Sequence, residues 1–124
     1  MWLVTRVGLL SVVQAGPEPG SKPDALRRLM VRARSRQHLE LLKRDHPVLR
    51  SYPIIESEPH RDYRWRLIVP RATLSAVVAK MVDGINYANF KSTCASAPEL
   101  EPGYIGALHA VWGSFRRLQE PRAP

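Results

Sequence analysis

The 124-residue chain has a single cysteine, no long apolar run and few acidic residues. The first two shortages each argue against a class of protein. Cys94 alone cannot form an internal disulfide, which fits a reducing compartment. The longest uncharged apolar run, from Val7 to Ala15, falls well short of the roughly 18 residues that a membrane-spanning helix needs. The first residues also lack the charged start, apolar centre and cleavage site of a secretory signal. We therefore expect a cytoplasmic protein without a transmembrane helix.

The motifs that usually accompany catalysis are missing as well. The seven glycines are scattered, so there is no glycine-rich phosphate loop, and no serine lies in a nucleophile-elbow context. The four histidines show no metal-ligand spacing, so we expect no metal and no cofactor. We predict that the protein is not an enzyme. The alternative is a small enzyme with a cleft centred on His60 or His109, which would need a carboxylate within hydrogen-bond reach.

What the sequence does have is positive charge. The formal net charge is +8, because 15 arginines and 4 lysines stand against 11 acidic residues. A GC-rich genome would favour arginine over lysine, but codon bias does not explain the shortage of acidic residues. A surface of this sign favours phosphate polymers, anionic membranes or an acidic protein partner.

Hydrophobic periodicity predicts a single α+β domain over residues 1–124, with a loop at 15–24 and a frayed tail at 119–124. Alternating residues predict strands at 29–34 and 61–70, two short β-rich runs predict strands at 2–6 and 9–14, and a short apolar run predicts one at 52–55. Apolar residues at helical spacing predict helices at about 36–45, from Pro70 to Gly84 and from Tyr104 to Leu118. The segment 96–103 is expected to form a second loop.

This order of elements predicts an antiparallel sheet of four to five strands with helices on one face. From the third strand onward, the order strand, helix, strand, strand, helix matches a ferredoxin-like arrangement without its last strand. The N-terminal hairpin would supply the missing strand, which makes the topology equivalent to a circular permutation.

Two predicted strands place charged and apolar residues on opposite faces. In the stretch from Arg61 to Pro70, the apolar face holds Tyr63, Trp65, Leu67 and Val69. In the earlier strand, Val31 and Ala33 alternate with arginines. If helices cover the apolar residues, four guanidinium groups emerge together on the other face. These candidate binding residues are Arg32, Arg34, Arg64 and Arg66.

Arginines and an aromatic residue on one sheet face are typical of proteins that bind single-stranded RNA. Depending on strand order, Trp2 or Arg6 would join the four arginines. The usual aromatic pair and glycine-rich strand motif of RNA-recognition domains are absent. We predict a small non-catalytic binding or adaptor protein whose basic sheet face engages an acidic protein surface or single-stranded nucleic acid, and no membrane. A homodimer through this face is a further alternative, although the arginines argue against it.

Five short motifs spread along the chain resemble a family of small uncharacterised bacterial proteins. They are Met-Trp-Leu-Val-Thr-Arg at 1–6, Val-Arg-Ala-Arg at 31–34, Asp-Tyr-Arg-Trp-Arg-Leu-Ile-Val-Pro at 62–70, Asn-Tyr-Ala-Asn-Phe-Lys at 86–91 and Leu-His-Ala-Val-Trp at 108–112. The resemblance spans nearly the whole chain, from which we expect a free-standing protein. It implies no activity and no site residues. Where it implies a helix continuing beyond Lys91, this chain has Ala97-Pro98 and Pro102-Gly103.

Overall fold

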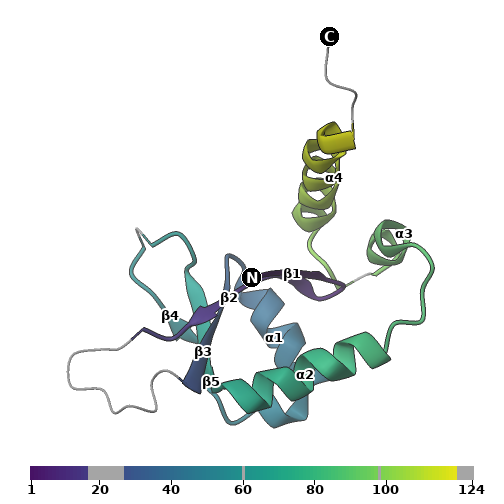
Figure 1. Ribbon diagram of the computed structural model, residues 1–124. Helices are drawn as coiled ribbons and strands as arrows, with labels where there is room; N and C mark the ends of the chain where they lie inside the picture. The colour runs from purple at the N-terminus through teal and green to yellow at the C-terminus, as the bar shows by residue number, and fades with distance from the viewer. Residues whose placement is uncertain (17–26, 60, 98, 120–124) are drawn as a thin grey trace. The chain divides into compact units, whose positions relative to one another are not determined.

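The computed structural model describes residues 1–16, 27–59, 61–97 and 99–119. These residues form a five-stranded antiparallel sheet together with helices, so the predicted α+β class is confirmed (Figure 1). The strands are β1 (Trp2–Thr5), β2 (Gly8–Gln14), β3 (Arg28–Ala33), β4 (Ile55–Glu56) and β5 (Trp65–Pro70). They lie in the order β1-β2-β3-β5-β4, so β4 and β1 are the two edges of the sheet.

Two helices follow the central strands of this sheet. Helix α1 (Arg36–Asp45) comes after β3, and its bounds are those predicted. A short 3-10 helix, η2 (Pro47–Leu49), follows it. Helix α2 (Arg71–Asp83) begins directly after Pro70 and ends at Gly84, as expected. The chain changes from strand to helix at Pro70, because proline has no N–H with which to continue the hydrogen bonds of a strand.

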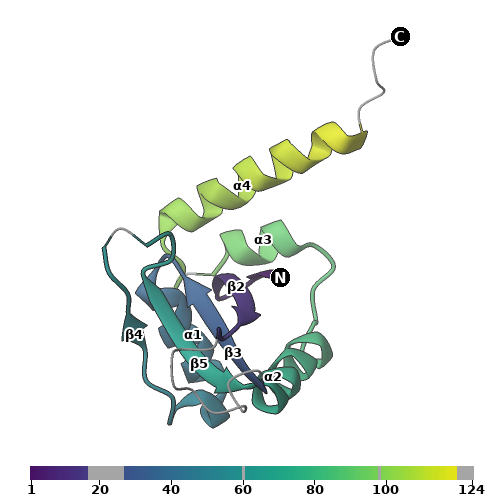
Figure 2. The same cartoon turned by 60° about the vertical axis from the view of Figure 1, so that its left-hand side comes forward.

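The apolar face of the sheet packs against α1 and α2. Figures 1 and 2 show both helices along the same side of the strands. The buried cluster consists of Leu10, Val12, Val31, Ala33, Leu67 and Val69 from the strands, with Leu39, Leu42, Leu49, Leu74 and Val77 from the helical side. Burying each Leu or Val contributes about 1.5–3 kcal/mol, so this layer decides which face of each strand points inward. The face turned away from α1 and α2 is called the open face below.

The predicted N-terminal hairpin is confirmed, and its geometry requires a glycine. Thr5 pairs with Gly8 across a two-residue turn, and the Thr5 hydroxyl donates to the Gly8 carbonyl at 3.0 Å. Gly8 has φ +139°, a conformation that residues with a side chain rarely adopt. The ring of His38, on α1, lies directly against its α-carbon and leaves no space for a side chain. This hairpin therefore docks closely on α1.

Two predictions about the stretch 61–70 are wrong. Strand β5 begins at Trp65 rather than Arg61, because β3 turns toward α1 after Ala33, the residue that pairs with Trp65. Tyr63 thus has no partner strand; it is buried, as predicted, but outside the cluster that packs between the sheet and the helices. Its ring is buried instead beneath the guanidinium groups of Arg32 and Arg34, which lie 4.6 and 4.3 Å from the ring centroid. Tyr63 therefore belongs to the open face.

The chain forms two compact units, Met1–Asn86 with the sheet and Tyr87–Pro124. The second contains α3 (Phe90–Ala95), α4 (Pro102–Arg116) and the 3-10 helix η3 (Arg117–Gln119). The break between α3 and α4 falls within 96–101, a segment expected to be a loop. The single domain expected over residues 1–124 stays a prediction. The predicted loop at 15–24 and tail at 119–124 lie almost wholly outside the described residues.

The apolar face predicted for the last helix is only partly buried. Leu108 is buried, whereas Trp112 and Phe115 are 49% and 58% exposed. The Trp112 ring is flanked by cations, with Lys91 Nζ at 3.8 Å and the Arg116 guanidinium at 5.4 Å from its centroid. Despite this apolar surface, none of the helices in the described ranges is both long and apolar enough to cross a membrane.

Candidate functional site

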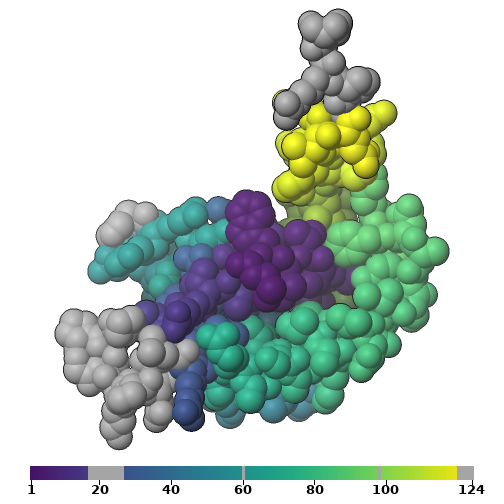
Figure 3. Space-filling view, viewed as in Figure 1, coloured from purple at the N-terminus to yellow at the C-terminus, as the bar shows by residue number. Residues whose placement is uncertain are grey.

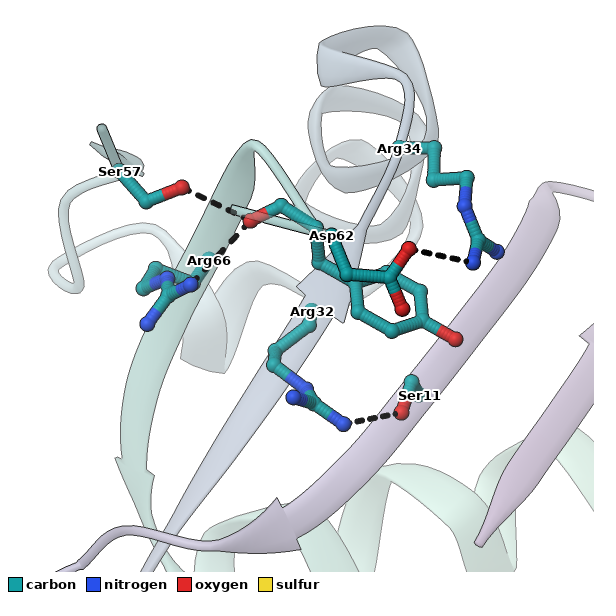
Figure 4. A network of polar contacts seen from close by, with 7 residues as sticks. Ser11, Arg32, Arg34, Ser57, Asp62 and Arg66 are labelled. Atoms are coloured by element: carbon teal, nitrogen blue, oxygen red, sulfur yellow. Dashed lines mark hydrogen bonds and ion pairs between the residues drawn. The ribbon is translucent and has the colours of Figure 1, made fainter. Parts of the chain in front are cut away.

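Two of the four predicted arginines lie directly opposite each other at the centre of the open face. Arg32 on β3 pairs with Arg66 on β5. Each alternates with buried core residues, Val31 beside Arg32 and Leu67 beside Arg66, so both side chains point away from the helices. Figure 4 shows the two side chains on the same side of the sheet. We call them the arginine pair.

The arginine pair is held by neutral groups. Arg32 Nη2 donates to Ser11 Oγ at 2.8 Å, and Arg66 donates to the Tyr63 carbonyl at 3.2 Å (Figure 4). Arg66 also donates to Met30 Sδ at 3.4 Å. The Nε atoms of both arginines are buried and make no hydrogen bond within the described residues. No carboxylate of the described chain contacts either guanidinium. Two like charges directly opposite each other on a sheet are destabilising, and no carboxylate among the described residues offsets this repulsion.

Arg34 and Arg64 have a different environment, because each is neutralised by a carboxylate. Arg34 Nη2 lies 3.0 Å from Asp62 Oδ1. Arg64 donates through Nε and Nη2 to Glu56 Oε1 at 2.9 and 2.7 Å. These side chains are about half exposed or more in both ion pairs. The four predicted arginines therefore do not form one uniform patch. The arginine pair has no carboxylate contact within the described residues, whereas Arg34 and Arg64 each belong to an ion pair.

Tyr63 connects these two groups. Its ring lies under Arg32 and Arg34, a cation–π arrangement that orients both guanidinium groups across the face. Its carbonyl accepts from Ser57 Oγ at 2.8 Å as well as from Arg66. Arg32, Arg34 and Arg66 thus share one buried tyrosine as a support. Sequence alternation gave no sign of this role, since it assigned Tyr63 to the core.

The pKa values of Arg66 and Arg34 are shifted in opposite directions. Burial lowers the pKa of Arg66, and the charges of Arg32 and Arg61 lower it further. For Arg34, burial also acts to lower the pKa, but the hydrogen bonds and charges of Asp62 and Tyr63 outweigh it and the pKa is raised. Both groups stay protonated at any physiological pH, because arginine starts far above neutrality.

The excess of positive charge belongs mainly to the unit that carries this face. Residues 1–86 contain fifteen Lys and Arg against eight Asp and Glu, whereas residues 87–124 contain four against three. The long-range field of the first unit therefore adds to the local charge of the arginine pair. Together they would draw an anion toward the open face.

The residues proposed for an alternative catalytic cleft give that hypothesis no support. His60 lies outside the described residues. His109 is exposed on α4, and no carboxylate contact to it is found in the part of the chain that the structure describes. Cys94 is fully buried on α3, away from solvent. Within the described ranges, no three His, Cys, Asp or Glu residues gather closely enough to hold a metal ion.

The candidate site is therefore the open face. Its arrangement suits binding of an anion by two fixed guanidinium groups, with a hydroxyl and a buried aromatic ring as supports. Comparison with protein families, with curated proteins and with solved structures finds no match to this chain.

Proposed function

We propose that this chain is a small non-catalytic binding or adaptor protein whose open face engages an acidic partner, protein or nucleic acid. The observation that supports it is the arginine pair, Arg32 and Arg66, two opposed cations with buried Nε donors and no carboxylate contact within the described residues. An anion placed against the pair would offset the repulsion between the two charges and accept hydrogen bonds from the outer Nη atoms. The pair is thus the proposed centre of the interface.

Arg34 is proposed to complete the interface at its border, where it would exchange its own carboxylate, Asp62, for one from the partner. Arg64 is not included, because its guanidinium lies 5.2 Å from the centroid of the Trp65 ring, which packs against the core. Such an exchange costs little, because exposed ion pairs contribute only about 0–1 kcal/mol. A homodimer through this face is less suitable, since a two-fold axis would bring the arginine pair toward a second arginine pair.

We also propose that the sheet has a permuted ferredoxin-like topology. The order β2-β3-β5-β4 and the connection of β3 to β4 through α1 support this assignment. In this arrangement β2, which precedes the core in sequence, takes the place of the last ferredoxin-like strand, and β1 extends the sheet beyond it. This topology leaves one face of the sheet without α1 or α2 and so available to a partner.

The proposed function is tested by heparin affinity chromatography with variants matched in net charge. Arg32→Gln combined with Arg66→Gln removes two positive charges from the open face. Arg50→Gln combined with Lys80→Gln removes two exposed charges from the helical side of the same unit. We expect the first double variant to elute at clearly lower salt than the wild type, because it loses the fixed binding groups. The second should elute close to the wild type.

Equal elution of the two double variants would contradict the proposal, because retention would then depend only on net charge. Circular dichroism and thermal unfolding should show that both variants remain folded. If removal of Arg32 and Arg66 disturbs folding through the lost support of Tyr63, Arg32→Lys combined with Arg66→Lys keeps the charge but loses the forked donors. That variant should show intermediate retention.

A further inference from the structure

A single row of residues crosses the open face from the edge strand to the arginine pair. Trp2 on β1 pairs with Ser11 on β2, Ser11 pairs with Arg32 on β3, and Arg32 pairs with Arg66 on β5. Residues that pair directly in an antiparallel sheet point to the same face. The row therefore holds an aromatic ring, a hydroxyl and two guanidinium groups on one surface. With strands about 4.8 Å apart, it spans about 14 Å.

Trp2 is available at one end of this row. Its side chain is 64% exposed, although its backbone is fixed at the beginning of the sheet. The Met1 amino group donates to the Val12 carbonyl at 3.0 Å, and the Met1 carbonyl accepts from Val12 N–H at 2.8 Å. Figure 3 shows the N-terminal strand, in purple, at the molecular surface. A large indole held on an anchored edge strand and left in solvent has the properties of a contact residue.

A second row, beside the first and on the same face, is apolar. Val13 pairs with Met30, and Met30 pairs with Ile68. All three are half-buried, so part of each remains accessible. The open face thus offers two cations and an indole in one row next to a row of apolar side chains. A partner that fits both rows presents anionic groups beside flat, largely apolar groups.

Single-stranded nucleic acid has this combination, because its charged phosphates run beside flat bases that are free to stack. We infer that the partner of the open face is a single-stranded nucleic acid, with phosphate held by Arg32 and Arg66 and a base stacked on Trp2. This inference rests on the proposed function and names the chemistry of the partner. A phosphate accepts hydrogen bonds from the outer Nη atoms of guanidinium groups such as those of Arg32 and Arg66. Base stacking on an exposed aromatic ring is a main source of affinity in sequence-independent binders of single strands.

An acidic protein would satisfy the guanidinium groups but gives no specific reason for an exposed Trp2 in line with them. Double-stranded nucleic acid is also less suitable, because its bases are already stacked on one another. The inference therefore predicts a preference for a flexible single strand over a duplex of the same sequence. It also predicts that Trp2 contributes only when the anionic polymer contains bases.

The test uses fluorescence anisotropy with a labelled oligothymidylate of about 10 nucleotides, within the usual site size of single-strand binding surfaces. Inorganic polyphosphate, which has the charge but no bases, serves as a competitor. We expect Trp2→Ala to weaken oligothymidylate binding by at least about 5-fold. The affinity for polyphosphate, obtained from the competition, should stay unchanged. Trp2→Phe should retain most of the affinity. Trp112→Ala, which removes an exposed tryptophan from α4, is the matched control and should bind as the wild type does.

The possible outcomes separate the inference from the function on which it rests. If Trp2→Ala binds the oligonucleotide as tightly as the wild type, or if Trp112→Ala has the larger effect, the inference is wrong. If polyglutamate binds through the arginine pair and oligothymidylate does not, the inference is wrong but the proposed function holds. If none of the three anionic polymers binds in a way that depends on Arg32 and Arg66, the proposed function itself fails.

Discussion

Leu67→Ala is expected to lower the free energy of unfolding by about 2–5 kcal/mol. Leu67 is fully buried at the middle of β5, where it faces the layer formed by α1 and α2. The substitution removes three side-chain carbon atoms from the core and leaves a cavity that the sheet cannot easily close. Chemical denaturation followed by circular dichroism would measure the loss.

The neighbouring residue on the same strand provides the control. Ile68 points to the open face and is only half-buried. Ile68→Ala should therefore cost less than half of what Leu67→Ala costs. If the two substitutions were equally destabilising, the open face would be as tightly packed as the helix-covered face, and it would have no room for a partner.

Gly8→Ala is expected to destabilise the protein by about 3 kcal/mol or more. Two independent costs combine at this position. The backbone has φ +139°, which strains any residue with a side chain, and an added β-carbon would overlap Cγ and Cβ of His38. Because these His38 atoms are close to the helix backbone, they cannot move aside without shifting α1. The measurement is again the change in the free energy of unfolding.

A double-mutant cycle measures the part of this cost that the His38 ring causes. His38→Ala removes the ring that the new β-carbon would meet, so Gly8→Ala should be less destabilising in that background than in the wild type. The remaining cost should be the backbone strain together with the overlap on the β-carbon of residue 38, which alanine keeps. A fully additive cycle would show that His38 and Gly8 do not constrain each other. Gly106→Ala, at a helical glycine with open space around it, should cause no comparable loss.

The elements with a regular pattern could be predicted from the sequence. Alternation identified β1, β2, β3 and β5, and the apolar spacing after Ser35 gave α1 its observed bounds. These predictions succeeded because each pattern reflects burial against one layer, which is a local property of the segment. The edge strand β4 is only two residues long, so its pattern was too short to place.

The position of Tyr63 could not be predicted in the same way. Alternation with Trp65 and Leu67 assigned it to the core, but strand pairing ends at Trp65 because β3 leaves the sheet after Ala33. The end of one strand is decided by what its partner does, and the partner lies about thirty residues earlier. For the same reason, the alignment of Trp2 with Ser11 and Arg32 required the strand order, which the sequence left open.

The sequence predicted which arginines make up the candidate site, but not which of them contact a carboxylate. Strand alternation predicted that Arg32 and Arg66 share a face, and the structure places them opposite each other. Which arginines have carboxylate partners depends on Glu56, in the two-residue strand β4, and on Asp62, in the irregular segment before β5. Charge counting therefore predicts four equivalent cations, whereas only the central two lack a carboxylate contact among the described residues.

The central claim is that an acidic partner binds at the arginine pair. It is tested most directly by the Nε–Hε resonances of 15N-labelled protein during titration with inorganic polyphosphate, with assignments made from Arg→Lys variants. The claim predicts that the signals of Arg32 and Arg66 shift together and saturate, while that of Arg50 does not move. Shifts spread evenly over all arginines, or no shift at Arg32 and Arg66, would contradict it.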